Sequence, residues 1–269
     1  MNKTFITKIT RRIIPFIFFL ILYTFVSNLY LFLDTALFPL WGNFLRPSIL
    51  PPPQKIFEKF VKYTITDNYL TFSVIISLVR VIISLCIGVP IGIIIGLFMG
   101  WSKKLGDYID PLYGLIRYIP PLSFVTLFIL WLGISELSRI LLITYSVIMV
   151  TILPTYHGIR DVPEKYVKAA RIFGAKQWIL LKNVVIPAAS PQILAGLRYS
   201  IAVAWAVLIA SEMIAATNGI GYMIVYAQRL FDTATIFLGI ICLFIIGFLM
   251  DNIVKEIIFK TTSWMKRAE

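Results

Sequence analysis

Long, almost unbroken apolar runs constrain this chain more than any other feature of its sequence. The longest, Leu70–Met99, is interrupted by a single charged residue, Arg80. Two more runs, Ile13–Leu33 and Ile236–Met250, reach or approach the ~20 residues that a helix needs to cross a hydrocarbon layer of ~30 Å. Several segments of the chain are therefore expected to cross a membrane.

The composition agrees with a membrane protein. Hydrophobic residues make up 59% of the 269 positions and charged residues only 14%, against about 25% charged residues in ordinary soluble domains. Apolar windows predict an all-α fold with about six spans, and Pro120 and Pro121 should kink or interrupt the third of them. The expected spans are 13–33, 70–100, 112–132, 138–156, 189–215 and 234–256.

The distribution of positive charge predicts the orientation of these spans. A net charge of +12 could indicate nucleic-acid binding, but such binding needs a basic patch on a water-facing domain, and no such domain is predicted. Instead, sixteen of the 25 Lys and Arg residues, with Lys255 at the end of the last span counted among them, lie before the first span, after the second, after the fourth and at or after the end of the last. Basic residues concentrate on the cytoplasmic side of cell membranes. We therefore expect two cytoplasmic tails, 1–12 and 258–269, and one transmembrane domain, 13–257.

Four glycines in the second predicted span recur at every fourth position. Small residues at this spacing form one ridge of a helix, where a neighbouring helix can approach closely. A phosphate-binding role is disfavoured, because the glycines lie inside an apolar run and not on a loop between a strand and a helix. The pattern predicts helix packing through Gly88, Gly92, Gly96 and Gly100.

Four charged residues are predicted at membrane depth, where a lone charge is costly and tends to face a partner or a water-filled path. Arg198 and Glu212 lie in the same predicted span, ~21 Å apart along a helix, and cannot pair within it. An arginine on the path could attract an oxyanion; the alternatives are structural ion pairs or snorkelling to the interface. The four candidates for the translocation path are Arg80, Arg117, Arg198 and Glu212.

No catalytic, cofactor or metal site is expected. The single histidine, His157, has no further ligands at a suitable spacing and is expected in an interfacial loop. Cys86 and Cys242 lie in apolar segments, where cysteine behaves as a small hydrophobe.

The segment 161–187 is basic and amphipathic, unlike the runs around it. Asp161 is expected to cap a first helix, with Glu164 and Lys168 paired at i,i+4 on its charged face. Gly174 permits a turn, and a second short helix should follow and end at Pro187. Such a cytoplasmic hairpin could lie among lipid headgroups or dock to a partner protein.

The sequence KAARIFGAKQWILLKNVVIP in this segment resembles the signature of ATP-binding-cassette (ABC) importer permeases. In that signature Glu-Ala-Ala is followed after three residues by Gly, and after nine more by Ile-x-Leu-Pro. Lys168 departs from the pattern, since it stands where the family usually has glutamate, which puts any role of that carboxylate in doubt. The matching positions are Ala169, Ala170, Gly174 and Pro187, with Val184 and Ile186 as the branched apolar residues.

The resemblance covers roughly residues 46–255 and is strongest to the nitrate, sulfonate and taurine branch. The segments that carry it are RPSILPPPQKIFEKF, GWSKKLGDYIDPLYGLIRYIPPLSFVTLFILWLGISELSRI and IPAASPQILAGLRYSIAVAWAVLIASEMIAATNGIGYMI.

The resemblance implies the fold of a type I ABC importer permease in the cell membrane, working as a homodimer beside a substrate-binding protein. The hairpin would sit in a groove on a partner ATPase, which hydrolyses the ATP; this chain has no nucleotide-binding loop of its own. The implied coupling residues are Lys168, Ala169, Ala170, Phe173, Gly174 and Pro187.

Other functions fit the sequence less well. A secondary transporter would need coupling-ion sites and usually an internal repeat, and an intramembrane enzyme would need a catalytic motif that the spans do not show. Within the importer class, a small anion of the sulfonate, taurine or nitrate type is the expected solute, and a thiamine-precursor-like pyrimidine or another small organic solute is the alternative.

Overall fold

A computed structural model describes residues 21–25, 27 and 49–261 of the chain. The expected first span and both expected tails lie largely outside the described residues. The part that is described contains helices and no strand, which confirms the all-α prediction.

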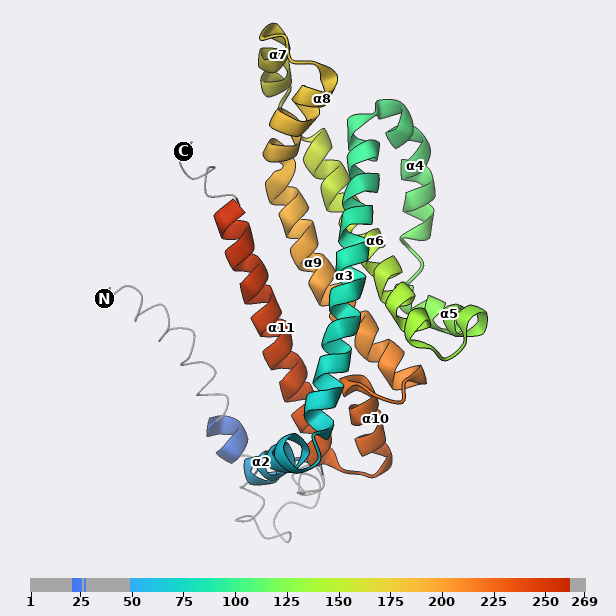
Figure 1. The fold of residues 1–269 in the computed structure, drawn as a ribbon, viewed down its shortest axis with the longest axis vertical. Helices are drawn as coiled ribbons and strands as arrows, with labels where there is room; N and C mark the ends of the chain where they lie inside the picture. Colours follow the sequence, from blue (N-terminus) through green and yellow to red (C-terminus); the bar gives the residue numbers. More distant parts are fainter. Residues whose placement is uncertain (1–20, 26, 28–48, 262–269) are drawn as a thin grey trace, which may run out of the picture. The chain divides into compact units, whose positions relative to one another are not determined.

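Within the described part of the chain, four helices are long and apolar enough to cross a membrane. They coincide with four of the predicted spans, because only isolated charged residues interrupt the apolar run of each. Figure 1 shows them as the long helices of the fold. They are α3 (Tyr69–Trp101), α6 (Glu136–Arg160), α9 (Ile186–Ala215) with the turns that precede it, and α11 (Thr233–Thr261).

The third predicted span, 112–132, is interrupted, as its two prolines predicted. Its first part belongs to α4 (Lys103–Ile116), and after a 3₁₀ turn at Pro121–Phe124 the chain continues as α5 (Val125–Leu132). The two halves are bent by 76°. This bend confirms the expected interruption at Pro120 and Pro121. Its cause is that proline has no N–H to donate and favours an extended conformation in the residue before it.

The glycine ridge of α3 lies against α6. A Cβ atom built on Gly92 would lie 2.7 Å from Thr151 Cβ, closer than side chains tolerate. The other three glycines meet α6 in the same way, each one turn from the last, so glycine lets the two helices approach. The facing pairs are Gly88 with Val147, Gly92 with Thr151, Gly96 with Thr155, and Gly100 with Ile159.

The expected second hairpin helix does not end at Pro187. The short helix α8 (Gln177–Leu180) passes through a π-helical turn, Leu181–Val185, directly into α9. Pro187 lies in the first turn of α9, where its missing N–H is tolerated and the preceding wide turn absorbs the irregularity. The prediction was wrong because it treated proline as a stop. Figure 1 shows α8 and α9 following each other as one continuous helical segment.

The chain forms two compact units. The larger comprises residues 73–222 and those from 243 onward, and it contains the charged cluster and the hairpin described below. The smaller comprises residues up to 72 and 223–242, with α2 (Pro53–Val61) and most of α10 (Ile220–Arg229). Within the smaller unit, Lys59 Nζ lies 2.5 Å from Asp232 Oδ2.

Candidate functional site

Arg80, near the start of α3, is the centre of a buried charged cluster. Its side chain is almost fully buried, and its five N–H donors all have acceptors. Nε and Nη2 form a fork on the Glu136 carboxylate at 2.6 Å each, Nη1 donates to Glu212 Oε1 at 2.6 Å, and Asn218 accepts the remaining two bonds. No donor of this guanidinium is left over for a solute in this conformation.

Glu212, near the end of α9, is fully buried and accepts bonds from three sources. Besides Arg80, Ser77 Oγ lies 2.8 Å from Oε1, and the backbone N–H of Gly221 lies 2.8 Å from Oε2. Gly219, at φ +112°, lies in the turn that follows α9 and packs directly against this carboxylate, so a Cβ atom at Gly219 would collide with it. A buried charge is tolerated when it is paired and hydrogen-bonded in this way.

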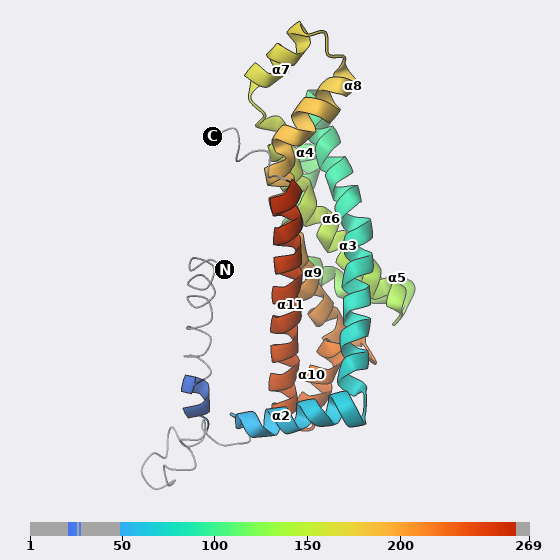
Figure 2. The ribbon, with the colours of Figure 1, turned by 60° about the vertical axis from the view of Figure 1, so that its left-hand side comes forward.

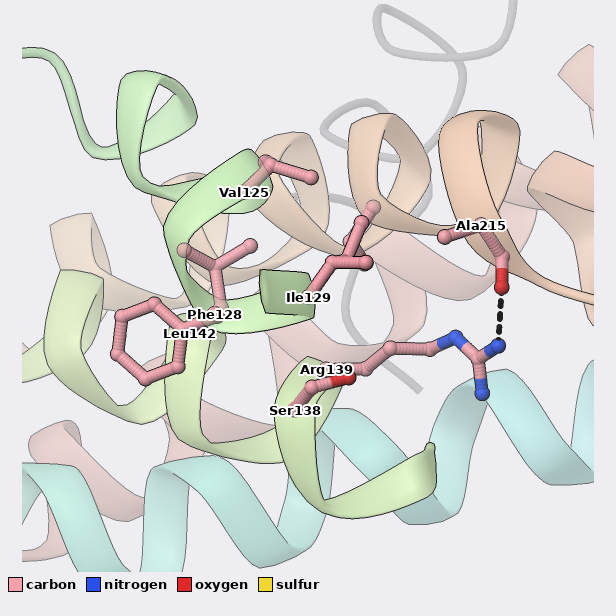
Figure 3. Close-up of a pocket in the computed structure, with 8 residues that line it drawn as sticks. Val125, Phe128, Ile129, Ser138, Arg139, Leu142 and Ala215 are labelled. Carbon is pink, nitrogen blue, oxygen red and sulfur yellow. Dashed lines mark hydrogen bonds between the residues drawn. The ribbon is translucent and has the colours of Figure 1, made fainter. Parts of the chain in front are cut away.

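Arg139 extends the cluster on the first turns of α6. Its Nη1 lies 2.8 Å from Glu136 Oε1, and Nη2 donates to the carbonyl of Ala215. Figure 3 shows this arginine reaching past Ser138 toward Ala215 beside a small cavity. At ≈ 10 Å³, the cavity holds about one water at most. The cluster therefore fastens α3, α6 and the end of α9, and it leaves no room for a solute.

The two remaining arginine candidates differ from Arg80. Arg198 Nε lies 2.5 Å from Asp251 Oδ1 of α11, an ion pair between two long helices. Arg117, just after the end of α4, contacts only the side chain of Tyr118 among the described residues: its Nη2 lies 3.3 Å from the hydroxyl, and its guanidinium lies over the ring. The structure thus brings Arg80 and Glu212 together and leaves Arg117 and Arg198 separate from them.

The hairpin begins differently from the prediction at its first helix. Asp161 does not cap α7 (Glu164–Ile172); its N–H still bonds the carbonyl of His157 at the end of α6, and Pro163 stands at the N-cap without a side-chain cap bond. The expected pair of Glu164 and Lys168 is confirmed, at 2.6 Å, and the lysine holds the pKa of the Glu164 carboxyl below its usual value.

The tip of the hairpin exposes large apolar side chains. Val167 and Ala170 pack inward against a core that includes Leu180. Ile172, Phe173 and Trp178 project instead, with 84%, 90% and 70% of their surfaces exposed. Figure 2 shows α7 and α8 forming a hairpin at the end of α9. Ile172 and Trp178 are not among the coupling residues that the resemblance implies.

The other predicted coupling positions lie along the same hairpin. Lys168 and Ala169 are exposed on α7, and Gly174 adopts φ +78° in the turn. Pro187 lies farther along, at the start of α9.

His157 is not in a loop as expected, but in the last turn of α6, where its ring lies against that of Tyr156. The helix continues because Gly158 to Arg160 keep its hydrogen bonding. The described residues hold no cluster of His, Cys, Asp or Glu that could bind a metal ion.

Comparison with known proteins adds a family to this geometry. Residues 88–261 match the model of the family described as the binding-protein-dependent transport system inner membrane component. The taurine transport system permease protein of Escherichia coli is 34% identical over 82% of this chain and 82% of its own length. A putative aliphatic sulfonates transport permease of Bacillus subtilis is 33% identical over 82% of this chain and 80% of its own length.

Two further matches agree. The nitrate import permease of Synechococcus elongatus is 31% identical over 74% of this chain and 72% of its own length. An inward-facing structure of the MetNI methionine ABC transporter matches with a TM-score of 0.65 over 72% of this chain and 96% of that chain, at 16% identity. At that identity the structural match shows the fold alone.

Proposed function

The chain belongs to the family of binding-protein-dependent transport system inner membrane components, the permease subunits of ABC importers, and on that premise we propose that it forms the membrane path for a small anionic solute. The proposed class is a sulfonate, an aminosulfonate such as taurine, or nitrate. The named relatives for taurine, aliphatic sulfonates and nitrate support this class.

Membership of the family implies a multi-pass protein of the inner membrane that works with an ATPase and a substrate-binding protein. We further propose a homodimer built from the single domain 13–257, with both termini in the cytoplasm. The concentration of lysine and arginine in alternate segments supports this orientation.

The hairpin is proposed to be the docking point for the ATPase, and its exposed apolar tip is the observation that carries this role. Isolated apolar residues on a surface need no explanation, but Ile172, Phe173 and Trp178 are three large, nearly uncovered side chains on one short hairpin. Buried aromatic anchors supply much of the energy of protein interfaces. The basic side chains around this tip, such as Lys168 and Arg171, would form its polar rim.

Continuity of the helices supplies a route for force. From Gln177 to Ala215 the chain forms one helical column of 39 residues, or about 58 Å at 1.5 Å per residue. One end of the column carries Trp178 and the other carries Glu212, so a displacement of the hairpin would be transmitted to the charged cluster. Rigid-body movement of this kind underlies alternating access in transporters.

The test of coupling uses the complete transporter, reconstituted with its ATPase and binding protein in proteoliposomes. Phe173→Asp should abolish stimulation of ATP hydrolysis by the loaded binding protein, because a carboxylate cannot fill an apolar groove. Phe173→Leu is the matched control and should retain most of it. Normal stimulation in Phe173→Asp would contradict docking through this tip.

The solute class is tested in the same vesicles by uptake of taurine, an alkanesulfonate, nitrate and an aminopyrimidine. Uptake of any of the first three supports the proposal. Uptake of the pyrimidine alone would contradict an anionic solute.

A further inference from the structure

We propose that a cavity between α4 and α6 is a binding site for a small zwitterion that carries an oxyanion at one end and an ammonium group at the other. The inference deepens the proposed function, on which it rests, because it assigns the transported solute a place and a charge pattern. Its ligand class is an aminosulfonate.

The cavity has a volume of ≈ 490 Å³, within the range of about 300–1,000 Å³ that small-molecule sites occupy. Charged or titratable groups dominate its wall, and they come from both helices and the residue that follows α6. They are Asp110 from α4, Arg117 directly after it, His157 and Arg160 from α6, and Asp161.

The arginines of this wall are uncommitted, unlike those elsewhere in the long helices. Arg80, Arg139 and Arg198 each have a carboxylate within 2.8 Å. Among the described residues, Arg117 contacts only the Tyr118 side chain and Arg160 only that of Tyr156. Two guanidinium groups therefore keep most of their donors available toward one cavity.

The aspartates of the wall are also without partners. The described part of the chain offers no ion pair or side-chain hydrogen bond to Asp110 or Asp161, although arginines line the same cavity. All four of these charged residues, Asp110, Arg117, Arg160 and Asp161, are exposed, so water solvates them when no ligand is bound. An arrangement in which they face one cavity without pairing with each other fits a ligand that supplies both counter-charges.

This charge pattern selects a zwitterion over a simple ion. An anion alone would satisfy Arg117 and Arg160 but leave two carboxylates unpaired, and a cation alone would do the reverse. Guanidinium groups bind oxyanions through paired N–H donors, and carboxylates accept from an ammonium group. Both ends of an aminosulfonate are thereby matched.

Two buried tyrosines hold the cavity in shape. The hydroxyl of Tyr113 donates to the carbonyl of Met149 at 2.7 Å and so fixes α4 against α6. The hydroxyl of Tyr156 accepts a bond from Arg160 and orients that guanidinium. Asp110 and Arg117 are seven positions apart, which places them about 10 Å apart along the axis of α4, enough for the two ends of a short zwitterion.

The position of the cavity links it to the hairpin. Asp161 lies three residues before Glu164, the first residue of α7, so movement of the hairpin would displace one wall of the cavity relative to α4. Release of the solute could thus follow the ATPase cycle without any further moving part.

The headgroup of an aminophospholipid has the same chemistry, with an oxyanion and an ammonium group. The test therefore uses the purified permease–ATPase complex in nanodiscs made of phosphatidylglycerol alone, whose headgroup has no ammonium group, and measures binding of radiolabelled taurine by equilibrium dialysis up to millimolar concentrations. Isethionate, which has a hydroxyl in place of the ammonium, serves as the competitor that separates the two ends of the ligand.

We expect taurine to bind at least about tenfold more tightly than isethionate, because isethionate lacks the ammonium group that the carboxylates would bind. A tenfold difference in affinity corresponds to about 1.4 kcal/mol. Arg117→Gln and Asp110→Asn should each weaken taurine binding at least about tenfold, and Arg117→Lys should restore part of it. Lys104→Gln, an exposed change on the same helix outside the cavity, should leave binding unchanged. Thermal unfolding of each variant checks that the complex remains folded.

Three results would overturn the proposal. Equal binding of isethionate with no effect of Asp110→Asn would make the site one for plain anions. Loss of taurine binding when phosphatidylethanolamine is added to the nanodiscs would assign the cavity to a lipid. Unchanged taurine binding in both Arg117→Gln and Asp110→Asn would place the solute elsewhere. Uptake by the reconstituted wild-type transporter is measured in parallel, because uptake without binding here refutes only this site, whereas absence of uptake of every anion refutes the proposed function.

Discussion

Arg80 on α3 and Glu212 on α9 are separated by 132 residues in sequence, yet Nη1 and Oε1 lie 2.6 Å apart in a site that excludes solvent from both side chains. The pair joins two helices that are not consecutive in the chain. Glu136 shares the same guanidinium and adds α6 to the junction. Three long helices are thus fastened at one place by one cation.

Glu212→Gln should lower the stability of the permease strongly. The change leaves the guanidinium of Arg80 buried with one carboxylate fewer, and removal of one partner of a buried ion pair costs about 3–5 kcal/mol. We expect a clear fall in the midpoint of thermal unfolding in detergent. Lys168→Gln is the control, because its pair with Glu164 is exposed and such helical pairs contribute only about 0.3–0.5 kcal/mol. If the two changes lowered the midpoint of unfolding equally, the buried pair would contribute no more to stability than the exposed one.

Gly92→Ala should also be destabilising, for a steric reason. The added Cβ would lie 2.7 Å from Thr151 Cβ and 3.0 Å from the carbonyl oxygen of Ile148, so α3 and α6 must separate. Overpacking of this kind costs about 1–3 kcal/mol. Thermal unfolding measures the effect. Gly247→Ala in α11 is the matched control, because nothing lies within 4 Å of its Cβ and alanine favours helix. A Gly92→Ala protein as stable as that control would contradict close packing through the ridge.

Much of the fold is readable from the sequence because lipid imposes a simple rule. Any segment that crosses the membrane must be long, apolar and helical, so the apolar runs that contain Arg80 and Arg198 identify α3 and α9 directly. The glycine spacing likewise identifies which ridge of α3 is small. The partner of that ridge is not readable, since it depends on which helix packs there.

The charged cluster could not have been assembled from the sequence. A lone arginine in an apolar run signals a partner or a path, but nothing local says which, and the partners of Arg80 lie far along the chain. The errors at Asp161 and Pro187 have the same origin. Local capping and helix-breaking rules were applied at positions where α6 and α9 simply continue through neighbouring hydrogen bonds.

The ion pair of Lys59 and Asp232 should make part of the stability depend on pH. Burial on its own would raise the pKa of the Asp232 carboxyl, but hydrogen bonds from Lys59 and Thr235 outweigh it and hold the pKa below its usual value. A lowered pKa in the folded state stabilises the protein above the unfolded pKa of about 4, and this contribution is lost as the pH falls through the lowered value.

Asp232→Asn isolates the charge, because asparagine keeps an oxygen for the Thr235 N–H that Asp232 Oδ1 accepts. At neutral pH the wild type should be more stable by about 0.2–1 kcal/mol, as expected for a partly exposed pair. The difference between the two unfolding midpoints should shrink as the pH is lowered toward about 3. A difference that stays constant over this range would show that the pair contributes nothing through its charge.

The turn of the hairpin offers a last test, because Gly174 combines a positive φ of 78° with empty space around the position of a Cβ atom. Glycine is therefore required here for its backbone conformation and not for lack of space. A β-branched side chain is strained at positive φ, at a cost of about 1–2 kcal/mol, whereas asparagine adopts this region more readily. In the reconstituted transporter, Gly174→Val should reduce the stimulation of ATP hydrolysis by the loaded binding protein, and Gly174→Asn should retain most of it. If asparagine failed as completely as valine, the glycine would instead be required for close contact with the ATPase, and the backbone explanation would be wrong.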